Sequence, residues 1–479
     1  MKKPFHSEIF LGLVAPVGTD SNYVTEQIEN FLSSQYNYNP HTIRLSSLIH
    51  SVKGVETKID ESSEYTRINT AMTAGDEARS GEDRDDILAR CSILKVQDIR
   101  GSDRPKENNA YIFRSIKTLG EAKLYKTVYG KGYFQLGFFS SRKDKEKYLH
   151  EKLNMTKAQA NKLINRDEDE DVEFGQRTRD SFSTSDVFFD VNDVDFEKHL
   201  KRFFDLIFCS PYITPSKDEF GMYLAFTSSF RSSDLSRQVG AVITNQNGEV
   251  ISTGCNEVPK YGGGSYWEGD LSDARDFRKG YDPNEKEKKR IASRILKKII
   301  KLKIEKSIIK PILTILNRSG LGEITEYGRI VHAEMEALLA CSRMGVSPKG
   351  GTLYATTYPC HNCAKHIIAS GIKRVVFVEP YEKSKALQLH DDSLGSGKRE
   401  EEVVLSTFIG VGPSRFIDLF SQNFSRGIKI IRKKDGRKID WNEKESLFRF
   451  QLLGMSYLDK EIGIGAELGR GIDDGEGKK

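Results

Sequence analysis

Apolar and polar positions alternate along the first part of the chain in the manner typical of α/β domains. An apolar run at residues 9–15 predicts a buried strand, and apolar positions three or four residues apart predict a helix over 24–32. Because strands and helices alternate, we expect residues 1–205 to form a doubly wound parallel sheet. The further elements predicted here are a strand at 111–115, a helix at 119–128 and a strand at 133–140.

The end of this first domain is more polar. A helix with polar faces is predicted over residues 148–164, and the acidic run Arg166–Asp171 follows it. Such a run is typical of a solvated surface loop, and its carboxylates would also suit Mg²⁺. We expect the surface loop.

A second α/β domain is predicted over residues 214–460. It begins with a helical pattern at 217–229, and residues 245–248 (Asn-Gln-Asn-Gly) have the turn chemistry of a hairpin. The glycine-rich, charged residues 465–479 are expected to be disordered. The other predicted elements are strands at 239–244, 250–255, 351–356, 374–378 and 406–411, and a helix at 383–390.

Residues 257–331 are an insertion in this second domain. Its centre, residues 286–310, carries eleven Lys or Arg and two Glu, with isoleucines at helical spacing, so we expect a basic amphipathic helix. A solvated packing helix is the simpler interpretation. Attraction of polyphosphate or nucleic acid is the alternative.

Composition excludes several classes of protein. The 479 residues are 37% hydrophobic with a formal net charge of +5, which alone does not argue for nucleic-acid binding. No apolar run approaches the roughly 18 residues of a membrane span, and residues 9–15 are too short for a signal peptide. Six scattered cysteines are not a disulfide framework, so we expect a cytoplasmic protein in a reducing compartment.

A glycine turn follows the first predicted strand. Residues 16–21 (Pro-Val-Gly-Thr-Asp-Ser) lie between strand and helix, where backbone amides can hold phosphate. Relative to the P-loop pattern, Thr19 replaces the lysine and Asp20 replaces the hydroxyl residue, so we expect a degenerate loop without hydrolysis. We predict that Gly12, Gly18, Thr19, Asp20 and Ser21 bind a regulatory nucleotide. An ordinary β-α turn capped by Asp20 or Ser21 is the alternative.

The strongest chemical signal is His332-Ala-Glu334 followed by Pro359-Cys360-His-Asn-Cys363. This is the signature of zinc-dependent nucleobase deaminases. One imidazole and two thiolates, from His332, Cys360 and Cys363, would hold Zn²⁺ and leave a fourth position for water. The Glu334 carboxylate is then the proton shuttle rather than a ligand.

Alternative assignments of these residues are weaker. A C-x-x-C motif alone also suits a redox pair or half of a structural zinc site. His361 and His366 are rival ligands, but neither has a suitably placed glutamate. The strand-length spacing and the proline before Cys360 favour the catalytic site.

These motifs, with Arg231–Ala241 and Gly254–Pro259, resemble the deoxycytidylate deaminase family over residues 215–420. The resemblance implies a cytidine-deaminase α/β/α sandwich that acts on free deoxycytidine nucleotides. It places nucleoside contact on Asn256, and we predict that Ala333 and Pro359 also line the substrate site. Residues 257–331 contain no cysteine or histidine, which argues against the second metal site of some members.

The whole chain also resembles bacterial anti-phage dCTP deaminases, which join a degenerate P-loop, kinase-like domain to a deaminase with a large insertion. That resemblance implies dCTP depletion during infection, a phage-derived trigger or regulatory nucleotide, and a homo-oligomer. The stretches that carry it are Gly12–Asp20, Tyr111–Ser115, Val128–Gly130, Gly175–Asp180 and Glu379–Ser384.

Two other functions compete with the free-nucleotide deaminase. A polynucleotide-editing deaminase would share every zinc residue, and the basic helix keeps it open, although we do not expect nucleic acid as a partner. A nucleotide-sensing protein on a deaminase scaffold is the second, but it need not retain a complete set of His332, Glu334, Cys360 and Cys363.

Overall fold

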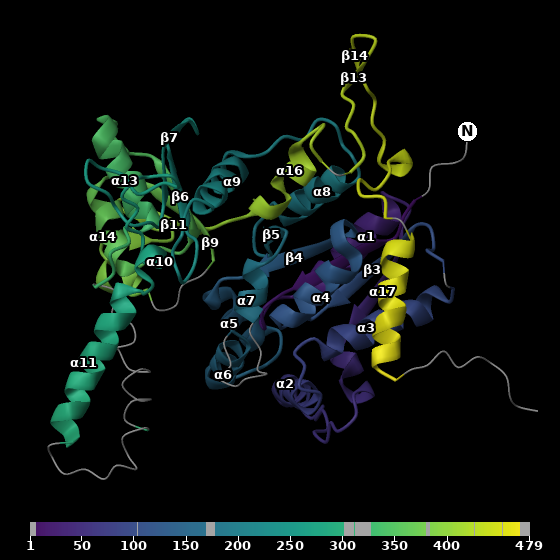
Figure 1. Cartoon of the computed structure of the whole chain (residues 1–479). Helices are drawn as coiled ribbons and strands as arrows, with labels where there is room; N and C mark the ends of the chain where they lie inside the picture. The colour runs from purple at the N-terminus through teal and green to yellow at the C-terminus, as the bar shows by residue number, and fades with distance from the viewer. Residues whose placement is uncertain are drawn as a thin grey trace, which may run out of the picture. The chain divides into compact units, whose positions relative to one another are not determined.

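The computed structural model describes residues 6–102, 104–168, 178–300, 311, 327–379, 384–425, 427–452 and 454–469. The chain forms two compact units, shown in Figure 1: Met1–Pro215 with Ile409–Lys479, and Ser216–Phe408. Each unit has its own six-stranded sheet, so the predicted α/β class is confirmed. None of the helices in the described ranges has the length and apolarity that a membrane crossing requires.

The first unit is built on a sheet in the order β12-β5-β4-β1-β3-β2. Neighbouring strands from β1 to β5 pair in parallel, and only β12 pairs antiparallel, with β5. The strands at 9–15, 111–115 and 133–140 are thus confirmed. The strand bounds are β1 Ile9–Val14, β2 Asn39–Arg44, β3 Asn109–Arg114, β4 Tyr133–Phe139, β5 Val187–Asp190 and β12 Gly410–Val411.

Helices cover both faces of this sheet. Successive side chains of β1 point to opposite faces, so neighbouring residues of this strand contact different helices. Leu11 packs in a core with apolar residues of α1 (Ser21–Ser34) and α8 (Phe196–Ile207). On the other face, the ring of Phe10 stacks on Tyr129 with centroids 3.7 Å apart. The remaining helices of the unit are α2 Glu64–Gly81, α3 Ile87–Arg100, α4 Leu119–Tyr129, α5 Arg142–Glu151, α6 Lys157–Glu168, α7 Thr178–Ser183, α16 Phe416–Phe420 and α17 Gly454–Glu467.

The predicted helix at 148–164 is wrong as a single element. The chain leaves α5 at Glu151 and begins α6 at Lys157, and Asn154 between them has a left-handed φ of 53°. The acidic run is also not simply a surface loop. Asp167 is fully buried in α6, whereas residues 169–171 lie outside the described residues.

The C-terminal part of the chain belongs to a different unit from the one predicted. The expected strand at 406–411 is two strands: β11 (Val403–Thr407) in the second unit and β12 in the first. Residues from Ile409 onward therefore belong to the first unit, and the expected second domain of 214–460 is too long. The expected disorder also starts too early, because α17 continues to Glu467; residues 470–479 lie outside the described ranges.

The second unit has a sheet in the order β10-β11-β9-β8-β6-β7. The strands from β10 to β8 pair in parallel, and β6 pairs antiparallel with β7 and β8. Asn245–Gly248 forms the predicted hairpin turn, in which Gly248 donates its amide to Asn245 O at 3.0 Å. The other bounds are β6 Gly240–Thr244, β7 Val250–Cys255, β8 Thr352–Thr357, β9 Arg374–Glu379 and β10 Leu394–Gly395.

Helices also cover both faces of this second sheet. One core joins β6, β8 and β9 to α13 (Ala333–Met344) and α14 (His361–Ala369). The opposite face approaches α9 (Lys217–Ser229), because a Cβ on Gly240 would lie 1.9 Å from Ala225 O. The predicted helix at 383–390 is shorter, α15 (Ala386–Leu389).

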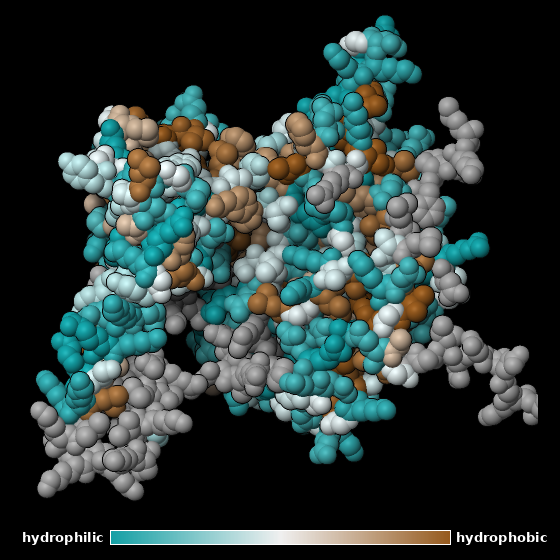
Figure 2. All heavy atoms as spheres, viewed as in Figure 1, coloured by the Kyte–Doolittle hydropathy of each residue, from teal (hydrophilic) through white to brown (hydrophobic). Residues whose placement is uncertain are grey.

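The insertion contains two described helices, α10 (Asp276–Lys279) and α11 (Pro283–Ile300). Lys289, Arg290 and Lys297 are exposed, and hydrophilic side chains gather over α11 in Figure 2. The beginning of the predicted basic helix is therefore confirmed as a solvated helix. Residues 301–310 and 312–326 lie outside the described residues.

The remaining elements are short. They comprise the hairpin strands β13 Lys433–Lys434 and β14 Arg437–Lys438, and the 3₁₀ turns Leu45–Ser51, Gly130–Gly132, Pro413–Arg415 and Glu443–Glu445.

Candidate metal centre

Two helix N-termini bring the predicted metal ligands together. His332 is the N-cap of α13, Cys360 is the N-cap of α14, and Cys363 lies in the first turn of α14. His332 Nδ1 is 3.3 Å from Cys360 Sγ and 3.4 Å from Cys363 Sγ. Among the described residues, these three form the group of His, Cys, Asp and Glu side chains with metal-binding geometry.

The donor set fits zinc. Zn–S and Zn–N bonds of about 2.3 and 2.0 Å imply a tetrahedral S···N separation of about 3.5 Å, close to the distances here. The hydrogen bond from the Cys363 thiol lowers the pKa of Cys360 to about 3, with help from His332, which favours the thiolate form that a zinc ligand needs. Three protein ligands with a cavity beside them leave a coordination position for water, as in catalytic rather than structural zinc sites.

Glu334 lies in the first turn of α13, two residues after His332. Its side chain is only 4% exposed, and burial raises the pKa of its carboxyl. The carboxyl interacts with Cys363 and with His332, which places it at the metal position without being one of the three ligands. A buried carboxyl at this place can accept and return a proton.

A close approach of β7 to α13 fixes the position of His332. A Cβ on Gly254 would lie 2.2 Å from Ala333 O and 2.5 Å from Ala337 N. Only glycine permits this contact between strand and helix backbones. Ser252 of the same strand donates its Oγ hydroxyl to Ala337 O of α13 at 2.9 Å, which is a second contact between β7 and the helix.

A cavity of about 210 Å³ opens beside the ligands. His332, Glu334 and Cys360 line it together with Tyr358, whose half-buried ring packs edge-on against Phe377 at 4.8 Å. The cavity is therefore bounded by an aromatic ring as well as by the reactive groups.

Part of the wall comes from the insertion, which sequence reasoning did not assign to the site. Arg329 Nη1 pairs with Asp276 Oδ1 at 2.8 Å, and both residues line the cavity with Arg237. Arg237 influences the pKa of His332, so its charge lies within electrostatic range of the metal ligands. The insertion contains many basic residues, so the sequence did not distinguish Arg329 from the other cations as a residue of the site. The other residues of the wall are Asp234, Ser236, Val239, Asp282, Asn284, Gly328, Ile330 and Thr357.

Asn256 lines the cavity, and its amide holds the adjacent loop. Its Oδ1 accepts from Val239 N at 2.6 Å, and its Nδ2 donates to Asp234 Oδ2 and Arg237 O, each at 2.9 Å. Both Nδ2 hydrogens are thus used within the protein. Direct contact of Asn256 with a nucleoside stays a prediction; the structure shows that it positions Arg237.

The other predicted site residues have different outcomes. Ala333 and His361 line the cavity, and His361 Nδ1 is buried without a hydrogen-bond partner in the described residues. Pro359 is not among the described lining residues; its carbonyl accepts from Ser384 Oγ at 2.8 Å. His366 is exposed on α14, and neither rival histidine joins the metal-binding group.

The predicted nucleotide-binding turn lies in the first unit, and none of its described residues lines the cavity of the metal centre. Gly18, Thr19 and Ser21 line a second cavity, whereas Asp20 caps α1 by accepting from Tyr23 N at 3.0 Å. Gly12 serves packing, because a Cβ there would lie 1.9 Å from Tyr133 Oη. The helix-capping alternative for this turn is therefore present in the structure.

Comparison with known proteins gives the second unit a family. The family described as "Cytidine and deoxycytidylate deaminase zinc-binding region" matches residues 215–379. Deoxycytidylate deaminase of Enterobacteria phage T4 is 34% identical over 166 residues, which are 34% of this chain and 78% of that protein. Human deoxycytidylate deaminase is 27% identical over 160 residues, 33% of this chain and 63% of that protein.

Shorter and structural similarities were also found. ComE operon protein 2 of Bacillus subtilis is 51% identical over 53 residues, so this chain spans 28% of its length. The crystal structure of dCMP deaminase from cyanophage S-TIM5 in complex with dCMP and dUMP is 18% identical. It covers 41% of this chain and 100% of that chain, with a TM-score of 0.24.

Proposed function

Because the chain belongs to the deoxycytidylate deaminase family, we propose that it hydrolyses the exocyclic amine of free deoxycytidine nucleotides. A single observation carries the proposal: one imidazole and two cysteine sulfurs form one metal-binding group, and the buried Glu334 carboxyl lines the same cavity as His332 and Cys360. Water and a deoxycytidine nucleotide are consumed, and a deoxyuridine nucleotide and ammonia are formed.

His332, Cys360 and Cys363 hold the metal. When bound, zinc lowers the pKa of a coordinated water and so supplies a nucleophile near neutral pH. Two ligands stand at helix N-caps, where the positive end of the helix dipole favours thiolate over thiol at Cys360.

Glu334 moves the protons. Its carboxylate takes a proton from the attacking water and delivers it to cytosine N3 while the oxygen adds to C4. It then takes the remaining hydroxyl proton and passes it to the leaving amine as the C4–N bond breaks. Burial raises the pKa of Glu334, which brings its acidity closer to that of the groups it serves.

Arg237 and Arg329 are the cations that meet the substrate phosphates. Both line the same cavity as Glu334, and Asn256 fixes the Arg237 loop through the Arg237 carbonyl. Arg329 is held by Asp276 and by Ala274 O at 3.1 Å, so it is already oriented. Nucleosides without phosphate should therefore be poorer substrates than nucleotides.

The finer proposal is that dCTP is the physiological substrate and that its depletion protects cells against phage. It rests on the resemblance of the whole chain to bacterial anti-phage dCTP deaminases. Under this proposal the enzyme is a cytoplasmic homo-oligomer, with a phage-derived trigger or a nucleotide as its activating signal. Nucleotide pools before and after infection, in cells carrying wild type or Glu334→Gln, test it: an unchanged dCTP pool in wild-type cells contradicts the defence role.

The first unit, which contains the P-loop-like residues 1–205, restrains the deaminase in uninfected cells. Thr19 and Asp20 stand where a P-loop needs lysine and a hydroxyl, so regulation is favoured over hydrolysis. Gly18→Ala, at φ 90° and with its Cβ 2.8 Å from Lys145 Cβ, should change protection or toxicity. ATP or GTP hydrolysis by the full-length protein, or unchanged protection by Gly18→Ala, contradicts this role.

The direct test of the substrate class is product analysis. Zinc-loaded protein is incubated with dCTP, dCMP, deoxycytidine, single-stranded DNA and tRNA, and uracil or inosine products are measured by mass spectrometry. Deamination of a free deoxycytidine nucleotide supports the proposal. Deamination confined to a polynucleotide establishes the editing alternative instead.

A further inference from the structure

The first unit contains a cavity of about 220 Å³ at the carboxyl ends of β1, β2 and β3. In the sheet, β2 and β3 lie on one side of β1, and β4 and β5 lie on the other, so the winding reverses beside β1. Open parallel sheets bind ligands in the crevice at such a reversal point. Every residue that lines this cavity belongs to the first unit, and the metal centre does not contribute to it.

Cationic side chains dominate the polar part of the cavity, and carboxylates neutralise some of them. Glu64 accepts from Arg67 Nε and Nη2 at 3.0 and 2.7 Å. Asp167 accepts from Lys117 Nζ at 2.6 Å. The cations that line the cavity are Arg44, Arg67, Arg79, Arg114 and Lys117.

Arg44 and Arg114 are different, because neither forms a close ion pair among the described residues; the charges of Glu64 and Asp20 reach them only from a longer distance. They end β2 and β3 and occupy directly paired positions of the two strands, so two like charges lie side by side. Burial lowers the pKa of both guanidinium groups, and the charge of Arg44 adds to the effect on Arg114. Arg114 Nε is buried without a hydrogen-bond partner in the described residues.

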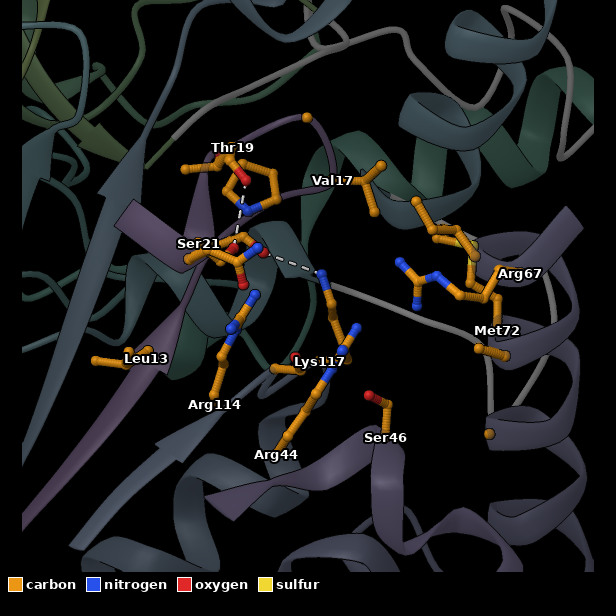
Figure 3. Close-up of a pocket in the computed structure, with 18 of the residues that line it drawn as sticks. Leu13, Val17, Thr19, Ser21, Arg44, Ser46, Arg67, Met72, Arg114 and Lys117 are labelled. Atoms are coloured by element: carbon orange, nitrogen blue, oxygen red, sulfur yellow. Dashed lines mark hydrogen bonds between the residues drawn. The ribbon is translucent and has the colours of Figure 1, made fainter. Parts of the chain in front are cut away.

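Two like charges held close together repel each other, and an unpartnered buried donor has an additional cost. An anion between the two guanidinium groups would remove both penalties. In Figure 3, Arg44, Arg114 and Lys117 point into the same space, with Thr19 and Ser21 above them. Thr19 Oγ1 is buried and lacks a hydrogen-bond partner among the described residues, so it offers a further donor to the cavity.

The glycine turn itself is a poorer place for this anion. Val17 N donates to Asp167 Oδ2 at 2.8 Å, and Thr19 N donates to Pro16 O at 3.1 Å. The Asp167 carboxylate thus already occupies an amide of the turn that a phosphate would need. The arginine pair, rather than the turn amides, is left available for a ligand.

One part of the cavity wall is apolar. Ile68 and Met72 of α2 face Leu149 of α5 and Leu153, and the same residues belong to one hydrophobic cluster. A ligand that fills the cavity must therefore have an anionic end and a less polar body.

We infer that this cavity binds a nucleoside phosphate, with the phosphate between Arg44 and Arg114 and the nucleoside against the wall formed by Ile68, Met72, Leu149 and Leu153. The site goes beyond the proposed deaminase reaction and does not depend on it. It assigns ligand binding in the first unit to side chains at the strand ends.

Isothermal titration of the full-length, zinc-loaded protein tests the inference. The probes are dGMP and dTMP, deoxyguanosine and thymidine, and inorganic phosphate. We expect at least one nucleotide to bind more tightly than its nucleoside and than phosphate. Arg44→Gln and Arg114→Gln should each weaken that binding about tenfold or more, since hydrogen bonds between charged groups are lost.

Two controls locate the site. Arg84→Gln, at an exposed arginine of the same unit that does not line the cavity, should bind the nucleotide like wild type. Arg237→Gln should also bind like wild type, because Arg237 lines the deaminase cavity. In the absence of ligand, the thermal midpoint of Arg44→Gln and Arg114→Gln should be unchanged or raised, because repulsion is relieved.

Three results would overturn the inference. The first is no binding of either nucleotide at millimolar concentration. The second is unchanged affinity in both Arg44→Gln and Arg114→Gln, or loss of affinity only in Arg237→Gln. The third is equal affinity for inorganic phosphate and nucleotide, which would leave an anion site without nucleoside recognition. Deaminase activity is measured on the same samples, so failure of this inference is separate from failure of the proposed reaction.

Discussion

Gly254→Ala adds one methyl group at the contact that positions the catalytic helix. The new Cβ would stand 2.2 Å from Ala333 O and 2.5 Å from Ala337 N, both backbone atoms of α13. Backbone cannot rotate away as a flexible side chain can. The helix that carries His332 and Glu334 must therefore move away from β7.

The size of the effect follows from these distances. Bringing the Cβ···O contact to 3.0 Å needs a movement of about 0.8 Å. Overpacking of this kind lowers the free energy of unfolding by about 1–3 kcal/mol. A misplacement of about 1 Å at a catalytic group can reduce the rate about 10²-fold, so we expect kcat/KM to fall by about that factor.

Gly240→Ala is the matched control. It places a methyl group 1.9 Å from Ala225 O of α9, on the other face of the same sheet, and should cost similar stability without displacing α13. Unfolding midpoints, zinc content and dCMP turnover are measured for both variants at a temperature where both are folded. A Gly254→Ala enzyme with wild-type kcat/KM, or one no worse than Gly240→Ala, would refute the claim that this contact sets the catalytic geometry.

Four further predictions address the metal centre and its surroundings. Cys360→Ala should lose zinc in metal analysis, and full zinc occupancy in this variant would show that Cys360 is not a ligand. Removal of zinc from the wild-type protein by a chelator should lower its thermal midpoint, and an unchanged midpoint would show that the metal does not stabilise the fold. Glu334→Gln should keep zinc but lose about 10²–10⁴-fold or more in kcat, and substantial turnover would assign the proton transfer to another group. Asn256→Ala should lower the free energy of unfolding by about 1–3 kcal/mol, because the buried Val239 amide loses its acceptor, and should raise KM by loosening the Arg237 loop; an unchanged KM would contradict its positioning role.

The metal centre could be predicted from sequence because its residues are local in two short motifs. His332 and Glu334 lie at the start of one helix, and Cys360 and Cys363 lie at the start of another. The spacing of the residues within each motif was therefore enough to predict that the four side chains form one site. Arg329 and Asp276 could not be predicted, because they are 53 residues apart and local periodicity does not show that the insertion brings them together at the cavity. Asn256 was predicted as a residue of the site, but the saturation of its amide by Asp234 and Arg237 O is a property of three-dimensional packing.

The same distinction holds for the fold. Buried strands such as β1 and β4 have continuous apolar runs, whereas β2 is largely exposed and carries no such run, so it was missed. The break at Asn154 depends on one left-handed residue in a polar stretch. Gly410 and Val411 pair with β5 across more than two hundred residues, a long-range contact that local patterns do not contain.

The central claim is that the cavity beside His332, Cys360 and Cys363 deaminates a free deoxycytidine nucleotide through Glu334. The most direct measurement is ammonia release and deoxyuridine nucleotide formation from dCMP and dCTP by zinc-loaded wild type and zinc-loaded Glu334→Gln. The account predicts one ammonia per deoxyuridine nucleotide with wild type and almost none with Glu334→Gln at equal zinc content. Absence of deamination of both nucleotides by the zinc-loaded wild-type protein, or equal rates in the two proteins, would contradict it.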